Sequence, residues 1–225
     1  MKLAIDSAQS SGSIALHDGT KLLYSAYFDI RVTHSETLMP AIDTALKLCG
    51  IKPVDLQEIY VCEGPGSFTG LRIGVATAKG IAYAGQLPVI THNSLEMLAL
   101  SCTSAHKNIL CVIDAKMNEC YAALYDPDLR VIIPPKVLGL KDILVLPISG
   151  SIVCGSAANA LMPYAEEIGL HFAPALLNIP RAENLIYLED YHPGKRYEGK
   201  LLADLEPNYL RESTAQIKAA ARQKP

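Results

Sequence analysis

The amino-acid sequence predicts an α/β protein built from two lobes of similar plan. Three observations carry this prediction: apolar runs alternate with helical patterns along the first half, the second half opens with the same pattern, and the composition supports a large core. Half of the 225 residues are hydrophobic and the formal net charge is only −3. A disordered chain would contain fewer apolar residues and more net charge, so the sequence describes a globular protein.

The first half has the clearest periodicity. The short apolar run at 2–6 predicts a strand that ends in a polar turn, and Asp18-Gly19 predicts a hairpin between the next two strands. Helices are predicted where apolar residues recur every three or four positions. The expected order is β-β-β-α-β-α-β-α, over residues 2–6, 12–17, 21–28, 35–49, 58–62, 68–84, 87–91 and a helix that starts at Ser94. Pro40 leaves two possibilities for the first helix, which either kinks there or begins there.

The second half repeats the start of the first. A shift of 108 positions lays Ile5 on Ile113 and Asp6 on Asp114, and both copies then continue into a returning strand and a hairpin that begins with Asp. We interpret this as a duplicated lobe. Its predicted strands cover 108–114, 119–126, 129–138 and 151–154, and its predicted helices cover 156–168 and 181–191. We expect a first lobe over 1–106 and an abbreviated second lobe over 107–225, whose last helix, 214–224, could fold back on the first lobe.

A β-β-β-α-β-α-β-α lobe used twice is the plan of the ribonuclease-H-like lobes of the actin-like (acetate kinase/actin) architecture. The sequence therefore predicts this α/β fold. Because a slightly acidic chain lacks the basic face that grips nucleic acid, we expect any RNA to be held mainly by a partner. No apolar run reaches the length of a membrane span, and six cysteines without a C-x-x-C pair fit free thiols in the cytoplasm.

The loop Glu63–Gly74 leaves a predicted strand and opens a predicted helix, where backbone N–H groups can hold an anion. It lacks the Gly-Lys-Ser/Thr of a phosphate-binding Walker loop. Small residues recur every four positions along the helix, which allows another backbone to pack unusually close. They are Gly66, Gly70, Gly74, Ala78 and Ala82. We interpret this small-residue stripe as a subunit interface, with internal packing as the alternative.

Polar residues at the ends of the first strands are candidates for nucleotide or phosphate contacts. Asp6 and Asp114 each end the first strand of a lobe, and Ser7, Ser10 and Gly12 could cradle phosphate in the first turn. The alternative is that all of them are ordinary turn residues. No two histidines are four residues apart, and no serine or cysteine triad can be assembled from the sequence. The sequence therefore predicts no catalytic residue and no metal site.

Several motifs resemble the TsaB (YeaZ) family over essentially the whole chain. The most specific is Gly64-Pro65-Gly66-Ser67-Phe68-Thr69-Gly70-Leu71-Arg72-Ile73-Gly74, and the others agree with it in order and spacing. They are Leu3–Ser7, His34–Glu36 with Leu38 and Pro40, Ile113–Glu119, and Pro207-Asn208-Tyr209-Leu210-Arg211. Lys116 departs from the arginine that is usual in the family, which puts nucleotide contacts at the second turn in doubt.

The resemblance implies a helper in the synthesis of threonylcarbamoyladenosine, a modification next to the anticodon of tRNA. In this system TsaD is the catalytic paralogue, TsaE is an ATPase, and TsaC supplies the threonylcarbamoyl-adenylate. The metal-binding His-x-x-x-His of TsaD corresponds here to Asn93 and Met97, with His92 one residue early, so the resemblance implies no metal. The family pairs with TsaD through first-lobe helices, here 35–49 and 68–84. The implied contacts are Leu38, Ile42, Ala45, Arg72 and the small-residue stripe.

We therefore expect a non-catalytic, cytoplasmic subunit that binds and activates TsaD, works with TsaE, and meets tRNA only through the complex. It would need no cofactor of its own, since ATP is used by the complex. The apolar helix predicts homodimers when the chain is alone. The alternatives are a stand-alone actin-fold ATPase or small-molecule kinase, which rests on Asp6, Asp114 and the glycine loop, and a metallopeptidase, which the missing His-x-x-x-His disfavours.

Overall fold

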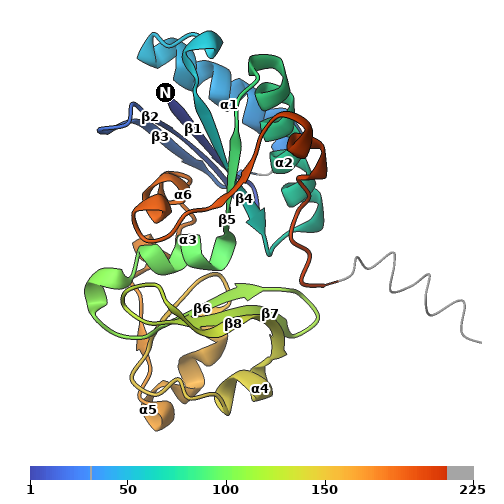
Figure 1. Cartoon of the computed structure of the whole chain (residues 1–225). Helices are drawn as coiled ribbons and strands as arrows, with labels where there is room; N and C mark the ends of the chain where they lie inside the picture. The colour runs from blue at the N-terminus through green and yellow to red at the C-terminus, as the bar shows by residue number, and fades with distance from the viewer. Residues whose placement is uncertain (31, 212–225) are drawn as a thin grey trace, which may run out of the picture.

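The computed structural model describes residues 1–30 and 32–211, and the predicted last helix, 214–224, lies outside them. Two mixed β-sheets form the framework, with helices between and outside them (Figure 1). The first sheet has the strand order β11-β5-β4-β1-β2-β3, and the second has the order β10-β9-β6-β7-β8. In both sheets an antiparallel strand pair continues into parallel neighbours, as the predicted repeat requires.

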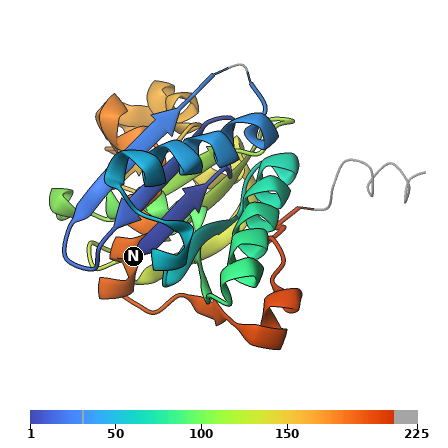
Figure 2. The same ribbon diagram turned by 90° about the horizontal axis from the view of Figure 1, so that it is seen from above.

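The first sheet follows the sequence prediction to within about two residues at most element ends. Its strands are β1 (Lys2–Asp6), β2 (Gly12–His17), β3 (Leu22–Phe28), β4 (Glu58–Gly64), β5 (Val89–Asn93) and β11 (Lys195–Tyr197). Helices α1 (His34–Cys49) and α2 (Phe68–Gly85) lie side by side over one face of this sheet (Figure 2). Apolar side chains of β1 and β2 pack there against both helices.

Helix α1 has clear local signals at both ends. The Glu36 carboxylate accepts a hydrogen bond from the Thr33 backbone N–H at 3.3 Å, and Gly50 ends the helix in the left-handed conformation at φ 66°. The helix begins at His34 and continues through Pro40. Of the two possibilities that the sequence left open, the start at Pro40 is therefore wrong.

The second sheet contains β6 (Ile109–Asp114), β7 (Glu119–Tyr125), β8 (Val131–Gly139), β9 (Ile152–Cys154) and β10 (His171–Phe172). Helix α3 (Ser94–Leu100) and helix α6 (Glu183–Tyr187) lie between the two sheets and share one apolar core with them (Figure 1). On its outer face the second sheet packs against α4 (Leu140–Leu144) and a 3-10 helix at Ala158–Tyr164, which α5 (Ala165–Ile168) extends. The second predicted helix, 181–191, is α6 followed by a 3-10 turn at Leu188–Asp190.

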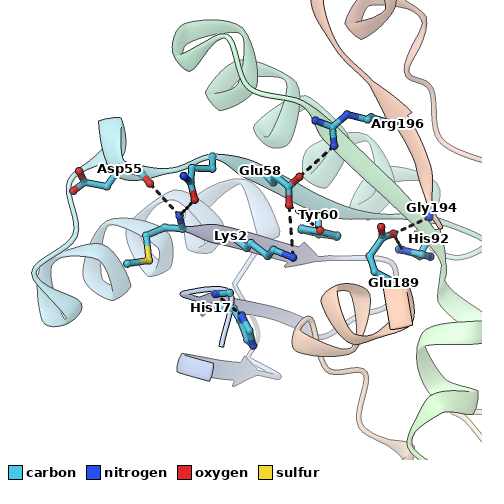
Figure 3. Close-up of polar contacts among 12 residues, drawn as sticks. Lys2, His17, Asp55, Glu58, Tyr60, His92, Glu189, Gly194 and Arg196 are labelled. Carbon is cyan, nitrogen blue, oxygen red and sulfur yellow. Dashed lines mark hydrogen bonds and ion pairs between the residues drawn. The ribbon is translucent and has the colours of Figure 1, made fainter. Parts of the chain in front are cut away.

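The chain returns to the first sheet near the end of its described part. The described residues after 107 therefore do not all belong to the second lobe that was predicted over 107–225. Helix α6 contacts β1, β2 and β4, and β11 pairs with β5 in antiparallel register. Two ion pairs hold this edge strand. One joins Lys195 to Glu63 at 3.1 Å, and the other joins Arg196 to Glu58 at 3.2 Å (Figure 3). Strands β10 and β11 and helix α4 are all too short to give a periodic signal in the sequence. Within the described residues, no helix is long and apolar enough to cross a membrane.

Candidate functional site

A cleft of about 830 Å³ lies where the turns of the two lobes meet. It is bounded by the β1–β2 turn, the glycine loop before α2, the β6–β7 turn and the chain from Asn208 to Arg211. Its lining residues are Ala8, Gln9, Ser10, Gly66, Ser67, Phe68, Thr69, Ile113, Asp114, Ala115, Lys116, Met117, Tyr121, Ser156, Asn208, Tyr209, Leu210 and Arg211. The topology therefore brings together three of the sequence motifs, which are far apart along the chain.

The glycine loop is packed directly onto the first turn. Ser67 caps α2 by accepting a hydrogen bond from the Gly70 N–H at 3.2 Å, and its own N–H donates to the Ala8 carbonyl at 2.7 Å. The Ser7 hydroxyl donates to the Gly70 carbonyl at 2.8 Å. A Cβ added at Gly66 would overlap the Ala8 carbonyl, and one at Gly70 would overlap the Ser7 carbonyl. Glycine is therefore required at both positions by the close approach of two backbones.

The interpretation of the small-residue stripe as a subunit interface is wrong. The partner that approaches closely is the chain's own β1–β2 turn, because Gly70 and Gly74 are both buried against Ser7. The other predicted contacts lie in the core of the first lobe and are at most 2% exposed: Leu38, Ile42, Ala45, Ala78 and Ala82. Gly66 is half-buried at the cleft. Of the nine predicted interface residues, only Arg72 is exposed.

Two of the five predicted phosphate contacts line the cleft, Ser10 and Asp114. The other three are buried. Ser7 is held by Gly70, and Gly12 lies under the Phe28 ring, which a Cβ would overlap. Asp6 is fully buried beneath the turn, where its Oδ1 accepts a hydrogen bond from the Ala8 N–H at 3.0 Å. Burial raises the pKa of the Asp6 carboxyl to about 6, and its Oδ2 has no hydrogen-bond partner among the described residues.

The β6–β7 turn supplies a cation that the sequence analysis did not assign to the site. The Lys116 ammonium lies 2.8 Å from Asp114 Oδ2, and this contact lowers the pKa of the Asp114 carboxyl. Lys116, Met117 and Asn118 all have left-handed backbones, with φ between 57° and 64°. Such a run is uncommon for residues other than glycine. It places the Lys116 side chain at the cleft.

The Pro207–Arg211 motif crosses the cleft as a closing segment. At its start, the Asn208 N–H donates to the Glu63 carbonyl at 2.7 Å, and the Tyr209 ring stacks on Phe68 with centroids 4.8 Å apart. Arg72 lies over the same Phe68 ring and donates to the Tyr209 hydroxyl at 3.0 Å. At its end, Arg211 donates to the Ala115 carbonyl at 3.0 Å, so the segment connects both lobes. This motif was predicted as a family feature, and its role in the cleft was not.

The described part of the cleft offers hydroxyl groups and two cations, Lys116 and Arg211. Such groups suit an anionic ligand. Arg211 is already paired with Glu119 at 3.1 Å, and Lys116 with Asp114, so neither charge is free in this arrangement. The predicted absence of a catalytic residue stays a prediction.

The two positions that correspond to the metal ligands of TsaD have other roles here. The Asn93 side chain caps α3 by accepting a hydrogen bond from the Leu95 N–H at 2.8 Å. Met97 is fully buried in the core between the sheets. His92 points to the segment that brings the chain back to the first sheet, where its Nε2 lies 2.7 Å from Glu189 (Figure 3).

A second polar group, His92, Glu96 and His192, lies outside the main cleft. One possible ligand atom from each residue lies within 4.8 Å of the other two. The prediction of no metal site rested on the absence of histidine pairs at helical spacing. The spacing of His92 and Glu96 was the available signal, whereas nothing in the sequence could bring His192 to them.

Comparisons with known proteins agree with this architecture. The family model "TsaD: tRNA N6-adenosine threonylcarbamoyltransferase" matches residues 30–187. The tRNA threonylcarbamoyladenosine biosynthesis protein TsaB of Bacillus subtilis (strain 168) is 30% identical over 238 residues, which cover 99% of both chains. TsaB of Escherichia coli (strain K12) is 29% identical, with 95% of each chain covered.

A solved structure confirms the predicted two-lobed fold. It is a protein with similarity to peptidase YeaZ from Pseudomonas aeruginosa, and it superposes with a TM-score of 0.74 at 26% identity, covering 93% of this chain and 99% of that one. Near-complete coverage excludes a match limited to one lobe. The matched family model, the full-length relatives and this structure place the present chain in the TsaB (YeaZ) family.

Proposed function

We propose that the chain acts in the synthesis of threonylcarbamoyladenosine in tRNA, as a non-catalytic subunit that binds and activates a TsaD-type transferase. The observation that carries the proposal is the likeness to TsaB of B. subtilis over 99% of both chains. In this proposal the chain works in the cytoplasm, and TsaE and TsaC complete the system. The complex consumes ATP, and the chain contacts tRNA only as part of the complex.

The residues at the TsaD ligand positions support a helper role. Asn93 is used to cap a helix and Met97 to fill the core, so neither is placed to bind a catalytic metal. Replacing a ligand by a fully buried methionine also fills the space that a metal and its water would need. In this proposal the chain acts through a partner that has retained the catalytic metal site.

The proposed partner surface is the outward face of α1 and α2, in place of the buried stripe. Met39 is 51% exposed, Leu48 71% and Tyr83 82%, and all three lie on these two helices. Gly80, on the exposed side of α2, has no atom within 4 Å of an added Cβ and leaves room for a close approach. Aromatic and apolar side chains beside small ones are typical of the centre of a protein interface.

The test is a reconstitution with purified TsaC, TsaD and TsaE, unmodified tRNA and ATP, with and without the chain. We expect product only when the chain is added. Tyr83→Asp should abolish TsaD binding and product together, whereas Val145→Asp should affect neither, because Val145 is 83% exposed on the second lobe. Equal product without the chain would overturn the helper role. Normal TsaD binding by Tyr83→Asp would overturn only the surface.

The cleft favours one alternative, a stand-alone actin-fold ATPase or small-molecule kinase. Ser10, Lys116 and Asp114 lie around a space of about 830 Å³. The measurement is ATP turnover by the isolated chain. Robust turnover that Asp114→Asn abolishes would favour this alternative, and turnover that survives the substitution would indicate a contaminating enzyme.

A further inference from the structure

The group His92, Glu96 and His192 joins two parts of the chain that are distant in sequence. His92 ends β5 with Asn93, and Glu96 lies in the first turn of α3, four residues later. His192 lies between the 3-10 turn Leu188–Asp190 and β11, in the segment that brings the chain back to the first sheet. The group therefore lies at the point where this return segment crosses α3.

The three side chains are close enough for a shared ligand. His192 Nε2 lies 3.9 Å from Glu96 Oε2, and the rings of His92 and His192 have centroids 5.7 Å apart. Ligand atoms around a tetrahedral zinc ion are separated by about 3.4 Å, given Zn–N and Zn–O distances near 2.1 Å. All three atoms lie within 4.8 Å of one another, so each pair must close by no more than about 1.4 Å to reach that spacing.

Glu96 has few charged partners for its burial. Its side chain is only 18% exposed, and among the described residues His192 is the only one within ion-pair distance of it. At 3.9 Å this contact is too long for a hydrogen bond. A bound cation would offset the cost of a charged Glu96 and would use the neutral form of the histidines.

A carboxylate already supports the innermost ligand. The His92 side chain is 1% exposed, and its Nε2 lies 2.7 Å from Glu189 Oε1 (Figure 3). The same Glu189 oxygen accepts a hydrogen bond from the Gly194 N–H at 2.7 Å. A carboxylate that orients the imidazole is the usual companion of a zinc-bound histidine. Glu189 also anchors the return segment on both sides of His192.

Glu96 and His192 also line a second cleft of about 570 Å³, so a cation has a path to the group and room for a water molecule. The cleft is lined in addition by Asp128, Leu129, Arg130, Val131, Asp190 and Tyr191. Arg130, the cation in this lining, is within 3.3 Å of Asp128. The carboxylates of Asp128 and Asp190 add negative potential near the path.

We propose that His92, Glu96 and His192 form a site for a divalent transition-metal ion, with Zn²⁺ as the best match to two imidazoles and one carboxylate. The ion links α3 to the return segment and so stabilises the attachment of β11 to β5. This site differs in its residues from the Asn93 and Met97 positions, and it departs from the sequence prediction of no metal. It is independent of the proposed role in tRNA modification.

The experiment uses the full-length chain without a purification tag, stripped with a chelator and dialysed. Zinc binding is measured by calorimetry, and retained zinc is counted after gel filtration. We expect saturable uptake of one ion per chain, and we expect His192→Ala and Glu96→Gln to weaken zinc binding at least ~100-fold. These two side chains are 36% and 18% exposed, so the variants should fold, which circular dichroism checks.

His171→Ala is the matched control, because His171 is exposed on the edge strand β10. Cys49→Ser tests for binding at a thiol, because the other cysteines are buried. Both should bind zinc as the unmodified chain does. Hydrogen exchange adds a second readout: zinc should slow exchange of residues 191–194 in the unmodified chain and in neither ligand variant. No uptake, uptake unchanged in both ligand variants, or uptake lost only in Cys49→Ser would each overturn the proposal.

Discussion

Gly70 and Gly80 lie on the same helix, α2, but in opposite surroundings. A Cβ on Gly70 would overlap the Ser7 carbonyl, whereas a Cβ on Gly80 would meet nothing within 4 Å. We expect Gly70→Ala to lower the free energy of unfolding by ~1–3 kcal/mol through overpacking. Gly80→Ala should raise it by ~0.5–1 kcal/mol, because alanine restricts the unfolded chain and favours helix. Urea unfolding measures both, and equal effects would contradict internal packing of the stripe.

Asp6 makes a prediction about pH. Its folded-state pKa of about 6 lies above the ordinary value of 3.8, so the folded chain binds the proton more tightly than the unfolded chain does. The stability contribution of Asp6 is therefore greatest at low pH and falls as pH rises from about 4 to about 6. Asp6→Asn removes this pH-dependent loss of stability. The free energy of unfolding of the variant should therefore exceed that of the unmodified chain by an amount that grows across that window towards ~3 kcal/mol.

Urea unfolding at several pH values measures the Asp6 effect. The control is Asp43→Asn, which removes a carboxylate that is 59% exposed on α1. A difference between Asp6→Asn and the unmodified chain that stays constant from pH 4 to pH 7 would show that burial of this carboxyl does not penalise its charge. A buried Asp6 also contributes to the cleft only by holding the β1–β2 turn, without direct contact to a ligand.

At the scale of elements, the closing segment is held by few contacts for its position. Tyr209 is 38% exposed and is fixed mainly by Phe68 and Arg72. We expect Tyr209→Ala to change the global free energy of unfolding by no more than ~1–2 kcal/mol, since the ring is only partly buried. Hydrogen exchange of the Asn208 amide, which donates to Glu63, should become at least ~10-fold faster because the segment opens locally.

The control for this segment is Tyr83→Ala, which removes an aromatic ring that is 82% exposed on α2. It should leave exchange of the Asn208 amide unchanged. If Tyr209→Ala left that amide equally protected, the backbone contacts of Asn208 and Arg211 would be sufficient to hold the segment. The stacking on Phe68 would then have no role in closing the cleft.

At the scale of the whole molecule, the outward face of α1 and α2 predicts self-association. Leu48 and Tyr83 are large, exposed and apolar, and an isolated chain can cover them with a second copy. We expect homodimers in sedimentation velocity, which Tyr83→Asp weakens and Val145→Asp does not. A strictly monomeric chain at high micromolar concentration would contradict the prediction. If TsaD uses the same face, it should dissociate the homodimer as it binds.

The layered arrangement leaves the outer side of α1 and α2 uncovered by other elements of the described chain. The inner faces of both sheets cover α3 and α6, and the outer face of the second sheet is covered by α4 and the 3-10 helix Ala158–Tyr164. Helices α1 and α2 cover the remaining face of the first sheet and turn their own outer side to solvent (Figure 2). The proposed partner surface is thus the outer side of two helices whose inner side completes the core of the first lobe.

The sequence by itself determined the order of the long elements, the repeat and the family. Local signals, namely periodicity, a capping box and terminal glycines, predict the longer elements, and the structure contains them. These elements are strands β1, β2, β4 and β6 and helices α1 and α2. Two of the five candidate phosphate contacts predicted from the sequence, Ser10 and Asp114, line the cleft, because one lies in the turn after the first strand of a lobe and the other ends such a strand.

Only the tertiary structure decided which surfaces those signals serve. A stripe of small residues indicates close packing but does not identify the neighbour, and here the neighbour is the chain's own first turn. The sequence likewise does not identify the neighbours of β11 and His192. Their partners, β5 and the pair His92 and Glu96, lie about a hundred residues earlier in the chain. Contacts over such separations depend on the path of the whole chain, which local periodicity does not contain.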